Sequence, residues 1–249
     1  MKCVILAGGF GTRISEETKI RPKPMIKIGG YPILWHIMKI YSSAGINDFI
    51  ICTGYKNKII ENYYKKDFIK KKLNTKFYFN KKNKWKITCV YTGKKSQTAG
   101  RLLKLKKILK NEENFFLTYG DGLSDINIKK TLNFFNKNKK LSLVSVVRPP
   151  ARFGEVKMKN NLVKKFVEKI DNKNVWINGG FFIMNTKILD FIKKSSESLE
   201  YELLPKLVKK KQLICYKHLG FWQAMDTLRD KIILAKKWKS KKPDWKIWK

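Results

Sequence analysis

The sequence predicts an α/β fold: a doubly wound, mostly parallel (Rossmann-like) mixed sheet with helices on both faces. Short continuous apolar runs, typical of strands buried on both faces, occur at residues 3–7, 49–52 and 114–119. Segments with the 3.6-residue period of a helix separate such runs, as at residues 33–44. The 249 residues are 43% hydrophobic and 13% aromatic, so we expect residues 1–249 to fold as a single domain with a full core.

The elements alternate in this way along the chain. Pro32 opens the first long helix and Gly45 closes it, as their positions at the two ends of the periodic segment indicate. The further elements that we expect are a lysine-rich helix near 58–71, strands near 75–79, 85–92 and 141–147, and a last helix from 228 to about 238.

The composition excludes several classes of protein. No apolar run approaches the ~18 residues of a membrane span, and the N-terminus does not have the pattern of a signal peptide, so we expect a cytoplasmic location. Four cysteines occur singly in strand-like segments without a CxxC pair, which predicts core thiols and not disulfides or a zinc site. They are Cys3, Cys52, Cys89 and Cys215.

The formal charge of +37 invites a nucleic-acid-binding interpretation. The lysines, however, are spread over almost every helix and turn and do not gather in one segment. A solvated lysine coat explains this distribution, and its field would draw anionic nucleotides toward the protein.

The first strand runs into a glycine-rich loop from Gly8 to Arg13. Gly8, Gly9 and Gly11 permit positive φ and let backbone N–H groups approach a phosphate, while Thr12 and Arg13 add a hydroxyl and a forked cation. This loop predicts an anion site; a glycine turn with an incidental arginine is the alternative.

Spacing excludes two familiar phosphate-binding loops. The dinucleotide fingerprint needs a third glycine where this chain has Ile14, and it needs an acidic residue that residues 50–56 do not supply. A Walker loop is excluded because no Gly-Lys-Ser/Thr ends the run.

Two aspartates and an arginine come where the carboxyl ends of strands should converge. Asp121 follows a buried strand and lies between two glycines, and carboxylates at strand ends suit Mg²⁺. Asp226 precedes the last helix, where a simple helix cap is the alternative. Arg101 lies in the first turn of a helix, against its dipole, so a contact with an anion or a base edge would explain it; a surface arginine is the alternative.

The opening strand with its GGFGTR loop, followed by Pro22-Lys23-Pro24-Met25, resembles the sugar-phosphate nucleotidylyltransferases, which have the nucleotide-diphospho-sugar transferase type of fold. Nearly the whole chain is similar to the branch of this family that uses CTP and glucose 1-phosphate. The segments that carry this similarity are 35–41, 117–122, 177–182, 220–223 and 225–231.

The resemblance implies two catalytic residues, Arg13 and Lys23. Arg13, with Gly11 and Thr12, would steady the β- and γ-phosphates as they leave, and Lys23 would contact the α-phosphoryl and sugar-phosphate oxygens. Both residues would therefore also belong to the nucleotide site.

The resemblance also divides the remaining site residues by ligand. Leu6, Gly8, Gly9 and Arg101 would lie near the base and ribose, and Asp121 and Asp226 would hold Mg²⁺. Lys169 would bind the sugar phosphate, while Glu168, Asn178 and Gly179 would read glucose. Residues 1–125 would thus form mainly the nucleotide-binding half, and residues 126–249 mainly the sugar-binding half with the C-terminal helix.

The implied partners are CTP and α-D-glucose 1-phosphate, which would give CDP-glucose and pyrophosphate, with no specific nucleic acid and no membrane. By resemblance the protein would be a homo-oligomer, a hexamer in that branch, and its product would feed lipopolysaccharide O-antigen biosynthesis. The alternatives are the same transfer from UTP or dTTP and, in a different class, a basic nucleic-acid-binding protein.

Overall fold

The computed structural model describes residues 1–149, 155–167, 175–240 and 242–248. The strands of the main sheet are β1 (Cys3–Ala7), β4 (Asp48–Thr53), β5 (Phe68–Lys72), β6 (Thr75–Asn80), β7 (Trp85–Tyr91), β8 (Asn114–Tyr119), β10 (Ser142–Val147), β13 (Ile177–Asn185) and β14 (Leu213–Lys217). Three short pairs lie outside it: β2 (Lys27–Ile28) with β3 (Tyr31–Pro32), β9 (Gly122–Ser124) with β15 (Trp222–Ala224), and β11 (Glu155–Lys159) with β12 (Leu162–Val167).

The helices lie mostly between these strands. They are α1 (Ser15–Thr18), α2 (Ile33–Ser43), α3 (Asn57–Tyr63), α4 (Thr98–Leu103), α5 (Lys106–Leu109), α6 (Ile128–Asn138), α7 (Leu204–Lys209) and α8 (Leu228–Trp238). A π-helical segment at Leu199–Leu203 precedes α7, and short 3₁₀ turns occupy Thr12–Ile14, Lys23–Met25, Lys65–Asp67 and Thr186–Phe191.

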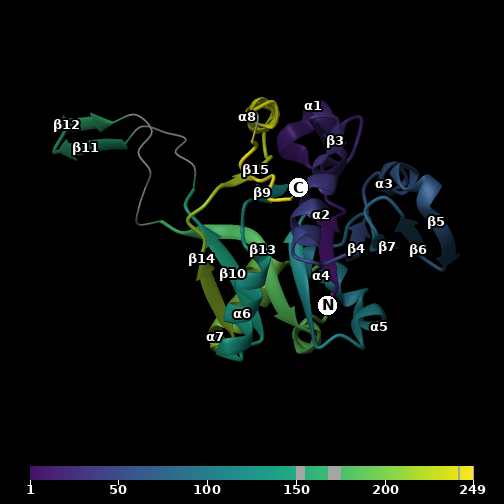
Figure 1. Cartoon of the computed structure of the whole chain (residues 1–249). Coiled ribbons are helices and arrows are strands. Elements are labelled where there is room, and N and C mark those ends of the chain that lie inside the picture. The colour runs from purple at the N-terminus through teal and green to yellow at the C-terminus, as the bar shows by residue number, and fades with distance from the viewer. Residues whose placement is uncertain (150–154, 168–174, 241, 249) are drawn as a thin grey trace.

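Among the described residues, nine strands form the main sheet in the order β14-β10-β13-β8-β1-β4-β7-β6-β5 (Figure 1). The central strands β8, β1, β4 and β7 pair in parallel, and β6 and β13 run against the others. The predicted mixed, doubly wound sheet is therefore confirmed, with its parallel part at the centre.

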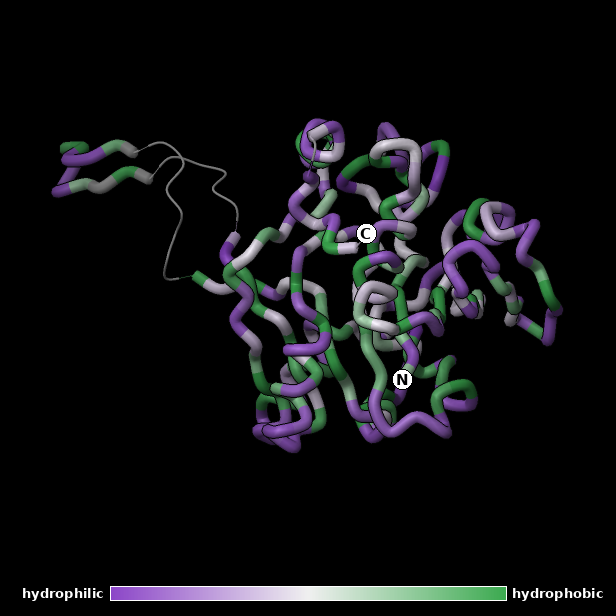
Figure 2. Tube along the Cα trace, viewed as in Figure 1, coloured by the Kyte–Doolittle hydropathy of each residue, from purple (hydrophilic) through white to green (hydrophobic). Residues whose placement is uncertain are grey.

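The two faces of the sheet carry separate hydrophobic cores. In β1, Cys3, Ile5 and Ala7 pack into one core while Val4 and Leu6 pack into the other, as the alternation of side chains along a strand requires. Apolar residues of α2, α6 and α8 fill the first core, and residues of α4, α5 and α7 fill the second. The expectation of helices on both faces is thus confirmed, and Figure 2 shows hydrophobic colours concentrated along the central strands.

The lysine-rich helix expected near 58–71 is wrong in its second half. Helix α3 ends at Tyr63, and Phe68–Lys72 forms the edge strand β5, paired with β6. The side chains of β5 are all exposed, and Phe68 packs edge-on against Tyr78 of β6. Pairing with β6 satisfies the backbone groups on one side of this segment, and its lysines suit an edge strand because they oppose further pairing on the other side.

Three of the four predicted core thiols are buried, but Cys215 in β14 is exposed. All four cysteines are free. β14 is the last strand on its side of the sheet and pairs in parallel with β10 alone among the described strands, so its side chains are only partly covered.

Candidate active site

A cavity of about 580 Å³ opens at the carboxyl ends of β1 and β8. After β1 the chain continues outward through β4 and β7 and then returns to place β8 on the other side of β1. Parallel sheets bind ligands at such switch points, because the connecting loops diverge there and leave a crevice. Register pairs Leu6 of β1 with Tyr119 of β8, so the two strands end side by side under the cavity.

The structure brings together nearly all the residues that the sequence singled out. Those that line this cavity are Leu6, Gly8, Gly9, Gly11, Thr12, Arg13, Lys23, Arg101, Asp121, Asn178, Gly179 and Asp226. Glu168 and Lys169 lie outside the described residues.

Two glycines of the opening loop are required by its conformation. Gly11 has φ of +67°, and a Cβ there would lie 2.7 Å from Cγ2 of Thr18. A Cβ on Gly8 would lie 2.1 Å from Nη1 of Arg101. Gly9, Thr12 and Arg13 are exposed along the loop, so their backbone and side-chain donors are open to a ligand.

Arg101 is buried beneath this loop, with 4% of its surface exposed. Its Nη2 donates to the carbonyl oxygen of Gly8 at 2.8 Å, while Nη1 donates to the carbonyl oxygen of Gly93 at 2.9 Å and to Oγ1 of Thr92 at 2.8 Å. Burial lowers the pKa of Arg101 from its usual value. The surface-arginine alternative is therefore wrong. The guanidinium links Gly8 of the glycine loop to Thr92 and Gly93, which follow β7, and so holds the loop in place.

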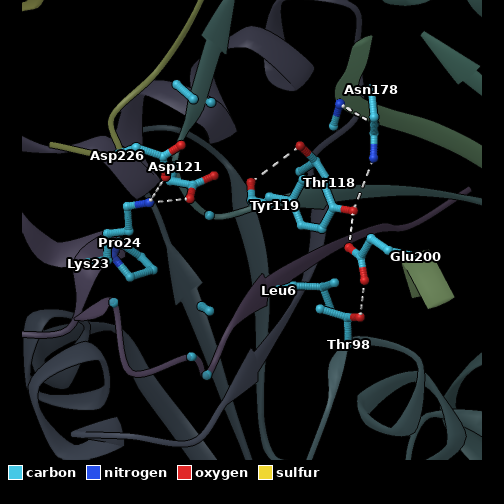
Figure 3. Close-up of a pocket in the computed structure, with 18 of the residues that line it drawn as sticks. Leu6, Lys23, Pro24, Thr98, Thr118, Tyr119, Asp121, Asn178, Glu200 and Asp226 are labelled. Carbon is cyan, nitrogen blue, oxygen red and sulfur yellow. Dashed lines mark hydrogen bonds and ion pairs between the residues drawn. The ribbon is translucent and has the colours of Figure 1, made fainter. Parts of the chain in front are cut away.

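Lys23 is the centre of a charged cluster on the opposite wall of the cavity (Figure 3). Its Nζ lies 2.6 Å from Oδ2 of Asp121 and 2.7 Å from Oδ1 of Asp226, and Arg13 Nη1 lies 2.8 Å from Oδ2 of Asp226. Burial would lower the pKa of Lys23, but the two carboxylates outweigh burial and the pKa is raised. Lys23 is thus a firmly charged ammonium group held by residues distant in the sequence.

Local structure explains how the cluster is built. Pro22 lies just before the 3₁₀ turn Lys23–Met25 and Pro24 lies within it, so the backbone around Lys23 is restricted. The cap of α8 is Thr227, whose side chain accepts from the Asp230 backbone N–H in a capping box. Asp226, one residue earlier, is therefore not the cap, and its carboxylate reaches both Lys23 and Arg13.

The pair Asp121 and Asp226 fits a magnesium ion. Both carboxylates converge on one cation, the ammonium group of Lys23, so their oxygens already point to a common position. Within the described parts of the chain no group of three or more His, Cys, Asp and Glu side chains could hold a metal ion. Mg²⁺ needs only one or two protein carboxylates when waters and nucleotide phosphates supply the other ligands, so two aspartates suffice.

The far side of the cavity is formed by the start of β13 and by β15. Trp222 Nε1 donates to the carbonyl oxygen of Gly179 at 2.7 Å. A Cβ on Gly179 would lie 2.8 Å from the carbonyl oxygen of Ser145, so a glycine is needed for β13 to lie this close to β10. Asn178 precedes it and also lines the cavity.

Sequence reasoning missed three polar residues of the same wall: Thr98, Tyr119 and Glu200 (Figure 3). Tyr119 donates to Glu200, Thr98 Oγ1 donates to Oε2 of Glu200 at 2.8 Å, and Asn178 Nδ2 donates to the Tyr119 hydroxyl at 3.2 Å. Tyr119 belongs to the recognisable segment 117–122, so its place at a strand end was available as a signal. Glu200 belongs to no motif, and its partners lie 81 and 102 residues away along the chain.

Comparisons with known proteins agree with this arrangement. Residues 2–237 match the family described as Nucleotidyl transferase. The chain belongs to the nucleotidyl transferase family. This nucleotidyl transferase is 43% identical to the glucose-1-phosphate cytidylyltransferases of Salmonella typhimurium and Salmonella typhi, over all of this chain and all of each relative. The structure of HddC from Yersinia pseudotuberculosis complexed with GMP-PN shares its fold, with a TM-score of 0.73 and 23% identity over 96% of this chain and 99% of that chain.

In the described regions, no helix combines the length and the apolar character needed to cross a bilayer.

Proposed function

We propose that this nucleotidyl transferase is a glucose-1-phosphate cytidylyltransferase, which joins CTP to α-D-glucose 1-phosphate and releases pyrophosphate. The observation that carries the proposal is the 43% identity to enzymes of that name over the whole length of both chains. The cavity adds chemical support, because a glycine loop and two cations face a pair of aspartates at the switch point of the sheet.

In this reaction an oxygen of the sugar phosphate attacks the α-phosphorus of the nucleotide in line with the departing pyrophosphate. A phosphate monoester is already ionised at pH 7, so no side chain has to act as a general base. The protein has to bring two anions together and offset their charge. Lys23 suits the α-phosphoryl and sugar-phosphate oxygens because its ammonium is charged and only 9% exposed.

Arg13 suits the leaving group. Its side chain is 74% exposed and sits at the end of the glycine loop, so it can turn from Asp226 toward the β- and γ-phosphates. Gly11 and Thr12 contribute backbone and hydroxyl donors beside it. Charge on the pyrophosphate grows as the bond to the α-phosphorus breaks, which is where a forked cation contributes most to the rate.

Magnesium is part of the proposal, with Asp121 and Asp226 as the residues that would hold it. The ion would neutralise charge on the phosphates when bound. The two aspartates then serve a second purpose in this chain, because they keep Lys23 protonated and fixed in the same cavity.

The sugar and base sites rest on fewer contacts. Asn178 and Gly179 are proposed to meet glucose, together with Glu168 and Lys169 as the sugar-side pair. The loop backbone from Leu6 to Gly9 is proposed to read the base, with Arg101 as the group that fixes that backbone. Cytosine offers an amino donor and a bare N3 where uracil and thymine offer the reverse, so one set of backbone groups cannot satisfy both.

The resemblance extends the proposal to the protein's setting. We infer a homo-oligomer, hexameric by that resemblance, which acts in the cytoplasm and supplies CDP-glucose for O-antigen biosynthesis. Light scattering coupled to gel filtration tests the oligomer directly, since a monomer of 29.3 kDa and its hexamer differ sixfold in mass.

A nucleotide panel tests the central proposal. Pyrophosphate release is followed with glucose 1-phosphate and CTP, UTP, dTTP, ATP or GTP in turn. We expect CTP to exceed the other nucleotides by tenfold or more in kcat/KM, a gap of about 1.4 kcal/mol. Equal efficiency with UTP or dTTP would replace the cytidylyl assignment with one of the alternative transfers, and no release with any nucleotide would contradict the function itself.

A further inference from the structure

A chain of hydrogen bonds crosses the cavity wall and ends on the amide of Asn178 (Figure 3). The backbone N–H of Leu199 donates to Oγ1 of Thr98 at 2.7 Å, and Thr98 donates to Oε2 of Glu200 at 2.8 Å. The other oxygen of Glu200 accepts from the hydroxyl of Tyr119. Four elements that are separate in the sequence therefore meet in one continuous chain of hydrogen bonds. We call this chain, from Leu199 through Thr98, Glu200 and Tyr119 to Asn178, the relay.

The donor and the acceptor of each hydrogen bond around Asn178 can be assigned from two sides, from Glu200 and from Gly180. The carboxylate of Glu200 accepts from Tyr119, so the Tyr119 oxygen is left to accept from Nδ2 of Asn178 at 3.2 Å. At the opposite end, the backbone N–H of Gly180 can only donate, and it donates to Oδ1 of Asn178 at 2.8 Å. Both ends therefore place the Asn178 amide in the same orientation.

Packing supports this geometry independently of the hydrogen bonds. Gly180 has φ of +79°, and a Cβ there would lie 2.7 Å from Cδ2 of the Tyr119 ring. The glycine thus leaves the room that the ring occupies.

We propose that Tyr119 and Glu200 are positioning residues that lock the Asn178 amide so that it offers the sugar substrate a hydrogen-bond donor. The Asn178 oxygen accepts from the backbone N–H of Gly180, and one of the two Nδ2 hydrogens is donated to Tyr119. Asn178 lines the cavity, so its second Nδ2 hydrogen is the donor that we assign to the sugar. The sugar hydroxyl at this position must then accept, and its own proton must find another partner.

This inference rests on the proposed function, in which the cavity binds a sugar 1-phosphate. It assigns a hydrogen-bond donor to the sugar site, which neither the motif segments nor the family relationship specifies. It also predicts how three substitutions rank, because Tyr119→Phe and Glu200→Ala break the relay whereas Glu200→Gln can preserve it.

Tyr119→Phe removes the hydroxyl and keeps the ring against Gly180. Asn178 then loses the partner of one N–H, and we expect KM for glucose 1-phosphate to rise about three- to tenfold with little change in KM for CTP. Glu200→Ala frees both Thr98 and Tyr119, and a similar or larger rise is expected. The double variant should have a KM no higher than that of Glu200→Ala alone, because the effects of substitutions within one hydrogen-bonded chain do not add.

Glu200→Gln is the conservative variant, and it tests whether the orientation of the Asn178 amide determines sugar binding. A glutamine can keep its oxygen toward Tyr119 and turn its amino group toward Thr98, so the orientation of Asn178 survives. We expect KM for glucose 1-phosphate to stay within about threefold of wild type, clearly below that of Glu200→Ala. Tyr201→Phe is the matched control, since Tyr201 is the next residue and its side chain is 86% exposed.

Substrate analogues test directly whether Asn178 donates a hydrogen bond to the sugar. Deoxy and deoxyfluoro glucose 1-phosphates are compared at each ring position with the wild-type enzyme. At the position that Asn178 reads, fluorine should retain more activity than hydrogen, because fluorine accepts weakly but cannot donate. Tyr119→Phe should abolish this preference for fluorine at that position.

Two results would overturn the inference: no position at which fluorine is favoured over hydrogen in the wild type, or Tyr119→Phe and Glu200→Ala variants that fold and keep wild-type KM for the sugar phosphate. A rise in KM for CTP equal to that for the sugar would also overturn it, because the relay would then serve the nucleotide. Failure of the proposed function looks different, since wild-type protein would then not turn over glucose 1-phosphate at all.

Discussion

The ammonium nitrogen of Lys23 lies 2.6 Å from Oδ2 of Asp121, and this contact joins two segments that are 98 residues apart in the sequence. The same nitrogen contacts Asp226, so one buried cation holds two acidic side chains in place. Removing either aspartate therefore has two effects: it loosens the lysine and, under the proposed function, it takes away a metal ligand.

Asp121→Asn and Asp226→Asn should each lower turnover by orders of magnitude while the protein stays folded. Pyrophosphate release measured over a range of Mg²⁺ concentrations checks this, with circular dichroism to confirm folding. Asp190→Asn is the matched control, because the Asp190 side chain is 77% exposed and forms an ion pair with Lys106 away from the cavity residues. Wild-type rates in Asp226→Asn, or full activity in excess EDTA, would refute the metal assignment.

Arg13→Ala and Lys23→Ala should differ in the kinetic constant they affect. Arg13 is exposed and, under the proposed function, contacts the leaving group, so its loss should reduce kcat by about 10²-fold or more with a small change in KM. Lys23 contacts both reacting phosphates under the proposed function, so its loss should impair kcat and KM for glucose 1-phosphate together. Lys104→Ala, at the exposed residue that directly follows α4, is the control. If both active-site variants altered only KM for CTP, these roles would be wrong.

The sequence alone predicted the parallel centre of the sheet and most of the cavity, for reasons that are local. Buried strands such as Cys3–Ala7 leave continuous apolar runs, and a loop that needs Gly8 and Gly11 leaves glycines. Asp121 was visible because it follows a buried strand directly. These signals do not depend on what the rest of the chain does.

What the sequence did not reveal depends on distant contacts. The strand at 68–72 forms only because β6 pairs with it, and lysine periodicity carries no sign of that pairing. Glu200 and Thr98 meet across 102 residues, and neither lies in a pattern that predicts a site. Arg101 was noticed for its place at a helix start, but its carbonyl partners were not predictable from spacing.

Arg101→Lys should damage the glycine loop. A lysine cannot reach Gly8, Gly93 and Thr92 together, so at least one buried carbonyl loses its donor. We expect the melting temperature to fall by roughly 5–10 °C, together with a rise in KM for the nucleotide. Arg148→Lys, at a site where the arginine lies over Trp176, is the control. A variant with unchanged melting temperature and a large loss of nucleotide affinity would show instead that Arg101 touches the ligand.

The lysine coat predicts weak and unspecific binding to duplex DNA. With a net charge of +37, association should be driven by release of counterions and should fall steeply as salt rises. Fluorescence anisotropy with two unrelated duplexes at several salt concentrations measures this. Sub-micromolar binding to one sequence and not the other at ~150 mM salt would support the nucleic-acid-binding alternative.

His36 should make the protein less stable in acid. Its ring is fully buried, Nε2 lies 2.9 Å from the carbonyl oxygen of Ile28, and Trp245 Nε1 lies 3.3 Å from Nδ1. A neutral ring with its proton on Nε2 satisfies both partners, whereas a protonated ring would set two N–H groups against each other at Trp245. Burial lowers the pKa of His36 from 6.5 to about 4, although the bond to Ile28 opposes this shift.

The direction of the pH effect follows from these two values. The unfolded chain takes up a proton near pH 6.5 and the folded chain only near pH 4, so stability is fully present above pH 6.5 and falls as the pH drops between them. The loss reaches about 3 kcal/mol at most.

In His36→Gln, an amide can donate to Ile28 and accept from Trp245 without titrating, so its free energy of unfolding should change less over this range than that of the wild type. Urea unfolding at pH 7, 5.5 and 4.5, followed by tryptophan fluorescence, measures the difference. His218→Gln should keep the wild-type decline, and parallel curves for His36→Gln and wild type would show that another group controls acid stability.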